Sequence, residues 1–342
     1  MTVVQPARAV LTECVRTATS APSLHNSQPW RFRVHGARID VYADPARRLD
    51  VLDPDGREQL ISVGAALFTL RLAIRSSGFR SYQALFPEPA RPGLVARVTV
   101  TGRYPVSTAV EALASAVPYR HTNRTPFALT PVPPAAMDLL QDAARREGAV
   151  LAVARPAGRD AILRLARSAD QWLHERPGYR GELARWTGGG ARRDGVPPTA
   201  AGPADALGAM PIRNLAGCST ASRPTGAFEP HPTIVVLATM GDHRQDWLRA
   251  GQALQRVLLT ATWQGLATTP ISQPIEMPAA RRRLIDPGSG LSAQMVIRVG
   301  YGSLTGRSPR RPLSEVLLPA RRTPRAVAHA SAVPISGLTS RG

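Results

Sequence analysis

The sequence contains no lysine, so arginine alone carries its positive charge. A count of 43 basic against 24 acidic residues gives a net charge of +19, which suggests a nucleic-acid or membrane partner. However, the arginines are scattered, only 5% of the residues are aromatic, and no recognised nucleic-acid-binding motif occurs. We therefore attribute the arginine excess to a coding bias and expect no nucleic acid. The alternative, an arginine-driven nucleic-acid binder, predicts DNA affinity that falls steeply with salt.

Cysteines and long apolar stretches are also scarce. Cys14 and Cys218 are too few and too far apart in sequence for a disulfide framework or a metal site, so we expect small core residues or inert surface thiols. No run approaches the ~18 apolar residues of a membrane helix, and the N-terminus has no apolar stretch of signal-peptide length. These absences predict no membrane partner and a soluble, cytoplasmic protein.

The motifs of several common enzyme classes are missing. No Gly-x-Gly-x-x-Gly, Walker loop, His-Glu-x-x-His or Gly-x-Ser-x-Gly occurs, so Rossmann, P-loop, zincin and α/β-hydrolase interpretations lack support. Glu229 with His231, and Asp242 and His243 with Asp246, lack metal-ligand spacing, and we expect them to flank a strand and cap a helix. The sequence predicts no metal site.

What the sequence does contain is an internal similarity. An offset of 187 (251 − 64) aligns Gly64 with Gly251 and Gly78 with Gly265, so both Gly-to-Gly intervals are 14 (78 − 64 and 265 − 251). Both segments carry apolar residues at helical spacing, and each leads to a short apolar run that ends at a glycine. Internal duplication is the favoured interpretation. Chance similarity between two amphipathic helices is the alternative.

Periodicity and turn residues predict the remaining elements. Helices are expected over 6–20, 56–77, 107–117, 135–147, 157–175 and 247–266, and strands over 31–34, 38–43, 94–101, 150–154, 232–238 and 295–299. Glycine and proline accumulate over 178–226, where we favour a lid over a site, with Trp186, Ile212 and Leu215 as anchors. A solvated insertion without a role is the alternative. The tail 319–342 is expected to be disordered.

Two polar motifs occur once each. In Pro22–Trp30 (PSLHNSQPW), proline at both ends of the motif restricts the backbone, neutral side chains offer donors and acceptors, and the tryptophan can anchor the segment in the core. In Arg120–Arg124 (RHTNR), two guanidinium groups and a hydroxyl suit a phosphate, although such a pattern also occurs on solvated faces. Together the motifs predict one composite site. Its ligand would carry a phosphate at one end and a hydrogen-bonding, partly aromatic remainder.

These motifs resemble those of a known family. Pro-Ser-x-x-Asn-x-Gln-Pro-Trp at 22–30 resembles the flavin-contacting segment of the FMN-dependent nitroreductases, and Arg120–Arg124 with Pro126-Phe127 is similar to that family's phosphate motif. The helix 247–266 and the following Pro-Ile-Ser-Gln resemble the segment whose backbone amides face flavin N5 and O4. Arg310-Arg311-Pro312 resembles the late basic residues that also reach the phosphate. The resemblance covers roughly residues 8 to 318.

In ordinary members of that family two identical subunits share the flavin, whereas here the motifs are divided between two halves of one chain. This resembles the fused, pseudo-dimeric Acg-type branch, in which one of the two flavin sites is lost. The first half has Arg16 but no second arginine at the right spacing. The resemblance implies an α+β, nitroreductase-like fold of two fused halves that form an intramolecular pseudo-dimer, each with a sheet flanked by helices. The halves would be 1–105 and 106–318, the second with a lid-like insertion at 178–226, and the protein a monomer.

The resemblance also implies roles for individual residues. Ser272 and Gln273 stand where the family usually has Glu-Gly, which puts the detailed flavin N5 geometry in doubt. A structural, hydrogen-bonding role for His25 is favoured over a proton donor, and no catalytic side chain is assigned because the cofactor carries the hydride chemistry. The phosphate would be held by Arg120, Thr122, Arg124 and Arg311, the ribityl chain or ring edge by Ser23, His25, Asn26 and Gln28, and the flavin edge by Pro270, Ile271, Ser272 and Gln273.

The function that the resemblance implies is that of an FMN-dependent oxidoreductase. It would take hydride from NAD(P)H and reduce a small planar acceptor such as a nitro compound or a quinone. The alternative is an FMN-binding protein that sequesters the cofactor with little or no turnover.

Overall fold

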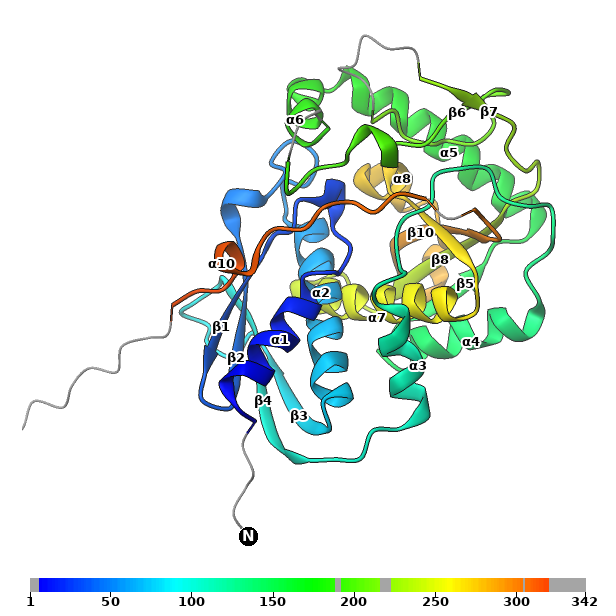
Figure 1. The fold of residues 1–342 in the computed structure, drawn as a ribbon. Helices are drawn as coiled ribbons and strands as arrows, with labels where there is room; N and C mark the ends of the chain where they lie inside the picture. The colour runs from blue at the N-terminus through cyan, green and yellow to red at the C-terminus, as the bar shows by residue number, and fades with distance from the viewer. Residues whose placement is uncertain (1–5, 188–191, 216–222, 304, 320–342) are drawn as a thin grey trace, which may run out of the picture.

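Two four-stranded antiparallel sheets organise the chain, one in each half (Figure 1). The computed structural model describes residues 6–187, 192–215, 223–303 and 305–319. The first sheet has the order β1-β2-β4-β3 and the second the order β5-β8-β10-β9. Their strands are β1 (Trp30–His35), β2 (Arg38–Ala43), β3 (Phe79–Leu85), β4 (Leu94–Arg103), β5 (Val150–Val153), β8 (Thr233–Thr239), β9 (Ala267–Ile271) and β10 (Ser292–Gly300).

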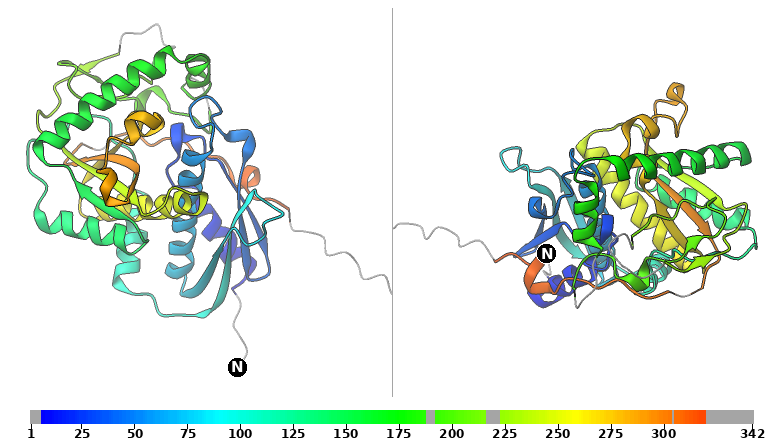
Figure 2. Two further views of the ribbon diagram at one scale, coloured as in Figure 1. Left: turned by 180° about the vertical axis from the view of Figure 1, so that it is seen from behind. Right: turned by 90° about the horizontal axis from the view of Figure 1, so that it is seen from above.

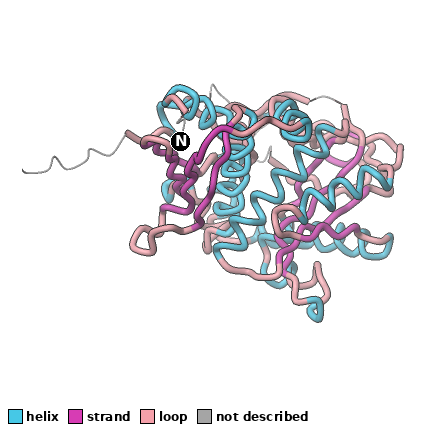
Figure 3. The backbone as a smooth tube through the Cα atoms, turned by 90° about the horizontal axis from the view of Figure 1, so that it is seen from below, coloured by secondary structure: helices cyan, strands magenta, loops and turns pink. Residues whose placement is uncertain are grey.

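Helices and strands follow the same order in the two halves. The first half runs α1-β1-β2-α2-β3-β4 and the second α4-β5-β8-α7-β9-β10, so strands at the same place in this order also hold the same place in the two sheets. Figure 3 shows the two groups of strands on opposite sides of the molecule with helices between them. These helices are α1 (Arg8–Ala18), α2 (Arg57–Ser76), α4 (Pro134–Arg145) and α7 (Arg244–Trp263), and α3 (Thr108–Ala116) connects the halves.

The long helices α2 and α7 pack against each other through the two aligned glycines. A Cβ atom on Gly64 would lie 2.2 Å from the carbonyl oxygen of Leu248 and 3.0 Å from the Cα of Gly251. A Cβ atom on Gly251 would lie 2.0 Å from the carbonyl oxygen of Ile61 and 2.8 Å from the Cα of Gly64. Ile61 and Leu248 are themselves 187 residues apart, so the two contacts are equivalent. Such reciprocity is typical of an interface with a two-fold axis.

The same reciprocity continues along the helix pair. The guanidinium of Arg256 lies over the ring of Phe68, 5.8 Å from its centre. Gln255 donates a hydrogen bond to the hydroxyl of Thr69 at 3.0 Å. Adding 187 to Phe68 and Thr69 gives the positions of Gln255 and Arg256, so each contact corresponds to the other across the same axis.

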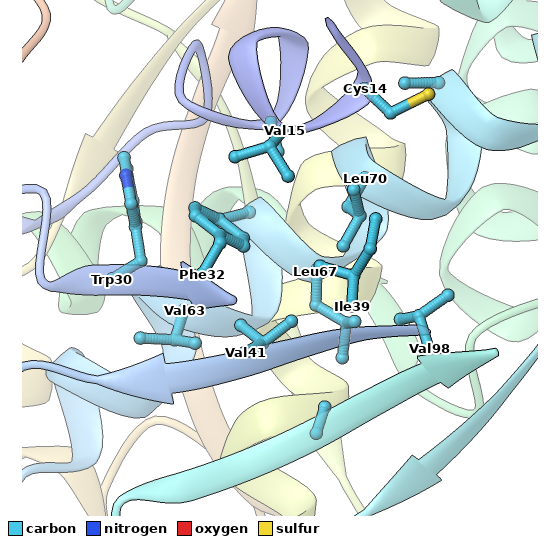
Figure 4. Packing of buried hydrophobic residues seen from close by; sticks show 14 of the residues in the cluster. Cys14, Val15, Trp30, Phe32, Ile39, Val41, Val63, Leu67, Leu70 and Val98 are labelled. Carbon is cyan, nitrogen blue, oxygen red and sulfur yellow. The ribbon is translucent and has the colours of Figure 1, made fainter. Parts of the chain in front are cut away.

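The core of the first half lies between α1, α2 and the inner face of the first sheet (Figure 4). Trp30 and Phe32 alternate along β1 with half-exposed residues, and their rings are fully buried, as expected of a strand with one face on the core. Val15 of α1 and Leu67 of α2 pack on the same cluster. Cys14 is also buried there, which confirms one of the two alternatives expected for it, and Cys218 lies outside the described residues.

An insertion between β5 and β8 gives the second half its extra length. It contains α5 (Pro156–Glu175), α6 (Tyr179–Trp186) and the short parallel strands β6 (Ala204–Asp205) and β7 (Thr225–Gly226). Figure 2 shows the helices of this insertion along one end of the molecule. The expected anchors Ile212 and Leu215 are buried, and Trp186 lies under the guanidinium of Arg47, 5.3 Å away.

The last described segment returns to the first half. It crosses from β10 to α10 (Leu313–Val316), drawn in orange in Figure 1, beside β1. Leu317 forms a parallel bridge with Phe32, and the N–H of Leu318 donates to the Phe32 carbonyl at 2.6 Å. In the other direction, Thr122 pairs with Thr268 at the edge of the second sheet. The expectation of disorder at 319–342 falls almost wholly on residues 320–342, which lie outside the described residues.

The predicted helices and strands are all present, with ends that differ by a few residues. The hairpin at His35-Gly36 is confirmed by the antiparallel pairing of β1 with β2. Sequence reasoning missed β3, β6, β7, β9 and α6, and the four-residue helices α8 (Gln273–Glu276), α9 (Pro278–Arg281) and α10. In β9, Pro270 interrupts an otherwise strand-like pattern, and the structure tolerates it because β9 is an edge strand of its sheet. In β3 only Phe79 is buried, so the strand shows little of the alternation that reveals such elements.

Candidate functional site

A cavity of about 90 Å³, partly open to solvent, lies between α2 and segments of both halves. Helical spacing places Glu58, Ile61, Ser62 and Ala65 of α2 on one wall. The other walls are Pro22, Ser23, Leu24 and His25 from the first motif, Thr122 and Arg124 from the second, Pro211, Ile212, Arg213 and Leu215 from the insertion, Thr269–Gln273, Leu254 and Met295. Eight of the twelve residues expected at the site therefore share one cavity. Asn26, Gln28, Arg120 and Arg311 are not among its lining residues.

The loop that carries the first motif is held in an unusual backbone conformation. His25, Asn26 and Gln28 have φ angles of 47°, 54° and 51°, in the left-handed region that residues with side chains rarely adopt. The Ser23 hydroxyl accepts a hydrogen bond from the Gln28 N–H at 2.9 Å, and the Ser62 hydroxyl of α2 accepts one from the Leu24 N–H at 3.2 Å. Non-glycine residues held in this region are concentrated at functional sites.

Asn26 and Gln28 connect this loop to distant segments. The Asn26 amide donates to the carbonyl of Gly195 at 2.9 Å and to that of Pro309 at 3.0 Å. The Gln28 amide donates to the carbonyl of Arg193 at 2.9 Å, and its oxygen accepts from the N–H of Arg311 at 2.8 Å. Both side chains thus hold the insertion and the C-terminal segment against the motif. Asn26 and Gln28 therefore lie behind the cavity wall and do not line the cavity.

His25 faces the cavity with a neutral ring. It is buried, and neither ring nitrogen has a hydrogen-bond partner in the described part of the chain. Burial, followed by the charges of Arg213 and Arg124, holds the pKa of His25 well below its usual value. A buried ring with one free donor and one free acceptor is suited to hydrogen bonding with a ligand in the cavity.

The arginines of the second motif are not balanced by carboxylates. Arg124 lines the cavity and donates to the carbonyl of Ala200 at 2.8 Å, while Arg120 is buried and donates to that of Ser20 at 3.4 Å. Burial, assisted by Arg213 and Arg223, lowers the pKa of Arg124 to about 10. Burial and the charge of Arg310 lower the pKa of Arg120 to about 9. Neither guanidinium has an ion-pair partner among the described residues.

The two C-terminal arginines differ in their surroundings. Arg310 donates to the Asn26 side chain and to the carbonyls of Ser20 and Ala21, each within 3.1 Å, and has no carboxylate partner among the residues described. Burial lowers its pKa to about 10. Arg311, the residue expected at the phosphate, instead pairs with Glu315 at 3.2 Å and donates to the Gln28 carbonyl. Arg310 therefore shares its environment with Arg120 more closely than Arg311 does.

Sequence reasoning also missed Arg213. This residue lines the cavity, forms an ion pair with Glu276 and donates to the hydroxyls of Tyr179 at 2.8 Å and Ser272 at 3.3 Å. It lies in the stretch interpreted only as a lid, and its acidic partner is 63 residues further along the chain. The Gln273 amide donates to the Pro211 carbonyl at 3.0 Å, so the 270–273 segment is fixed against the insertion as well.

The donor set fits an anionic ligand with a planar, mainly apolar part. The Nε atoms of Arg120 and Arg310 are buried without a hydrogen-bond partner, and a buried charge that lacks compensation is strongly unfavourable. A phosphate would supply the missing acceptors to several of these guanidinium groups. Leu254, Ile271 and Met295 give the cavity apolar walls for the remainder of such a ligand.

The described residues offer neither a metal-binding cluster nor a membrane-spanning helix. No group of three or more His, Cys, Asp or Glu side chains there is placed to hold a metal ion. No helix in those residues is long and apolar enough to span a bilayer. His243 and Asp246 form a capping box at the start of α7, and Glu229 forms a buried ion pair with Arg298. The capping interpretation of the Asp242–Asp246 cluster is confirmed.

Two proteins of Mycobacterium tuberculosis are similar to the chain over nearly its whole length. The "Putative NAD(P)H nitroreductase Rv3131" is 35% identical over 318 residues, which cover 91% of this chain and 90% of that protein. The "Putative NAD(P)H nitroreductase acg" is 29% identical over 315 residues, which cover 90% and 95%. No family model matches the chain.

Solved structures give weaker matches. The FMN- and NADPH-dependent nitroreductase NfnB from sphigopyxis sp. strain HMH has 17% identity and a TM-score of 0.40, and covers 62% of this chain and 99% of its own. A Desulfovibrio desulfuricans nitroreductase solved with FMN has 17% identity and a TM-score of 0.37, with 62% and 98% covered. At these TM-scores the structural likeness carries no argument about the site.

The assignment of the chain rests on its sequence relatives. In both M. tuberculosis proteins the aligned stretch spans about nine-tenths of each chain, so the similarity extends over both halves. The repeated order of helices and strands in the two halves agrees with the two-part architecture expected from the motifs. The chain belongs to the nitroreductase family, in the same branch as acg.

Proposed function

We propose that the protein is an FMN-dependent oxidoreductase that accepts hydride from NAD(P)H and reduces a small planar acceptor, of the nitro or quinone class. One observation carries the proposal: Arg124 from one motif and His25 from the other line one cavity, and neither ring nitrogen of His25 has a hydrogen-bond partner among the described residues. The two M. tuberculosis relatives, both called putative NAD(P)H nitroreductases, support the same reaction class.

The phosphate of FMN would be held by Arg120, Thr122 and Arg124, with Arg310 as a further cation. Arg311 has a carboxylate partner, Glu315, and would act through the backbone of the first motif. A phosphate bound by these guanidinium groups compensates charges whose pKa values are already lowered by burial. Such a phosphate would account for three buried arginines that have no carboxylate partner among the described residues.

The isoalloxazine ring would lie against the first motif and the 270–273 segment. Ser23 and His25 would contact it directly, while Asn26 and Gln28 would fix the loop that presents them. FMN supplies the hydride chemistry when it is bound. The apolar walls and the insertion exclude water from the ring, and the neutral His25 places no second charge beside it.

We also propose that residues 1–105 and 106–318 descend from a duplicated subunit, and that residues 178–226 form a lid on the surviving site. The reciprocal Gly64 and Gly251 contacts and the matching strand orders support the duplication. The hydrogen bonds from Asn26 to Gly195 and from Gln28 to Arg193 support the lid.

The test is cofactor retention by matched variants. Purified wild-type protein should show the visible absorbance of oxidised flavin, and Arg124→Ala should weaken FMN binding about 10- to 100-fold, since one charge-assisted hydrogen bond contributes about 1.5–3 kcal/mol. Arg16→Ala is the control, because Arg16 is exposed and pairs only with Glu13. Colourless wild-type protein that cannot be reconstituted with FMN would refute the proposal.

The second candidate is a protein that stores FMN without turning it over. The same lid contacts favour it, because they close the insertion over the first motif. Anaerobic addition of NADH or NADPH separates the two functions. Bleaching of the flavin spectrum followed by recovery with a quinone supports the oxidoreductase. Bound flavin that neither nicotinamide reduces supports storage.

A further inference from the structure

One carboxyl group belongs to two cavities. Glu58, in the first turn of α2, lines the cavity of the two motifs and also a second, larger cavity of about 500 Å³ that is partly open to solvent. The rest of Glu58 is enclosed, since only 3% of the residue is exposed. It therefore lies in the wall between the candidate cofactor site and a second cavity that opens to solvent.

The Glu58 carboxyl is only partly engaged by its neighbours. One oxygen pairs with Arg57, whose guanidinium is held in turn by the carbonyl and side chain of Gln294. The other oxygen accepts no hydrogen bond from any described residue. Asp53 accepts hydrogen bonds from the backbone N–H groups of Glu58 at 3.0 Å and Gln59 at 2.8 Å, which fixes this end of α2.

A second carboxyl group approaches from α8 (Gln273–Glu276). Glu276 pairs through one oxygen with Arg213 of the first cavity, and its other oxygen is buried without a partner in the described residues. Glu276 also lines the second cavity. The charged groups that face Glu58 are therefore Asp53 and Arg57 before and beside it, Glu276 from α8 and Arg281 from α9 (Pro278–Arg281).

These surroundings keep the proton on Glu58 near neutral pH. Burial raises the pKa of Glu58 to about 7, with Arg57 and Arg281 opposing this rise and Asp53 and Glu276 adding to it. An acid is most effective in catalysis when its pKa is close to the working pH. Arg57 is placed to stabilise the carboxylate that remains after the proton leaves.

We propose that Glu58 is the acid that protonates an acceptor during its reduction in the first cavity, and that water in the second cavity returns the proton. The inference rests on the proposed function. With a quinone as acceptor, the hydride would come from the reduced flavin, and Glu58 would give up the proton of its O–H bond to complete the hydroquinone. The carboxylate then takes one proton from solvent, so atoms and charge balance over the cycle.

The experiment isolates the acceptor step. Wild-type, Glu58→Gln and Glu58→Asp holoproteins are reduced with stoichiometric dithionite and mixed with 1,4-benzoquinone in a stopped-flow instrument between pH 5 and 9. Glu13→Gln is the matched control, because Glu13 is exposed on α1. Chemical reduction makes this measurement independent of the nicotinamide. Infrared titration of the same proteins without quinone follows the carboxyl group itself.

The wild-type rate should fall as the pH rises through about 7, and Glu58→Gln should be about 100-fold slower below that pH with a flat profile. Glu58→Asp should keep the pH dependence at a reduced rate, and Glu13→Gln should match wild type. The infrared titration should show a carboxyl group that ionises near neutrality in wild type and is absent from Glu58→Gln. If Glu58 had a structural role alone, Glu58→Gln would leave the pH profile of the reaction unchanged.

Two results overturn the inference, and they differ from failure of the proposed function. Glu58→Gln protein that binds FMN and keeps the wild-type rate and pH profile removes the proton-donor role alone. Absence of a neutral-range carboxyl titration in wild type does the same. Wild-type protein that retains no FMN refutes the proposed function, and the proton-donor role with it.

Discussion

The close contact between α2 and α7 predicts that a larger residue at Gly64 destabilises the fold. Gly64→Ala places a methyl group 2.2 Å from the carbonyl oxygen of Leu248, far inside van der Waals contact. That oxygen belongs to helix backbone, so it cannot move without shifting α7. Overpacking of a rigid core typically costs about 1–3 kcal/mol, and we expect about 2–4 kcal/mol here because both helices must separate.

Gly158 offers the matched control. It also lies in a long helix, α5, but a Cβ atom there would meet nothing within 4 Å. Gly158→Ala should therefore be neutral or stabilising by up to about 1 kcal/mol, the helix preference of alanine over glycine. The same Gly-to-Ala substitution is therefore expected to lower the free energy of unfolding at Gly64 and to leave it unchanged or raise it at Gly158.

The assay is thermal and urea unfolding of both variants, together with Gly251→Ala. Gly64→Ala and Gly251→Ala should each lower the melting temperature by about 4–8 °C, at about 2 °C per kcal/mol for a chain of this size. Similar losses are expected because the two contacts are reciprocal. If Gly64→Ala is as stable as Gly158→Ala, the close approach of α2 to α7 is wrong, and with it the argument for a two-fold relation.

Three further outcomes can be measured. Because the pKa of Glu58 is raised to about 7 in the folded protein, its protonated form stabilises the fold below pH ~4.5, and this contribution is lost as the pH rises through about 7. Wild type should therefore lose up to about 3 kcal/mol of stability to urea between pH ~4.5 and ~7, and Glu58→Gln should not. Equal pH dependence in the two proteins would contradict this. Asn26→Ala should destabilise the protein by about 1–3 kcal/mol and release FMN faster, since the carbonyls of Gly195 and Pro309 lose their donor; unchanged flavin release would show that these links do not matter. Light scattering should give a monomer, and a dominant dimer would count against the fused-halves interpretation.

Local patterns in the sequence predicted most of the fold. The 14-residue interval between Gly64 and Gly78, repeated from Gly251 to Gly265, correctly marks the two helices that meet at the centre. β9 was not predicted because proline fits a strand only at the edge of a sheet, and the sequence alone does not show which strands lie at an edge. Periodicity reports which residues share a face, and carries no information about which faces meet.

The sequence predicted several residues of the candidate site, but not the long-range hydrogen bonds and ion pairs that position them. Arg124 and His25 line the cavity as their motifs suggested. The position of Asn26 behind the wall depends on Pro309, 283 residues away, and that of Arg213 on Glu276. Such partners are set by tertiary packing, and a single sequence contains no local signal for them.

The return of the C-terminal segment also dictates when the site can be assembled during synthesis. Gln28 emerges from the ribosome early, yet its side chain is bound by the N–H of Arg311, 283 residues later. The Phe32 carbonyl likewise gains its hydrogen bond from the N–H of Leu318 only after Leu318 has been synthesised. The first motif and β1 therefore gain these two hydrogen bonds only after the chain has been synthesised through Leu318.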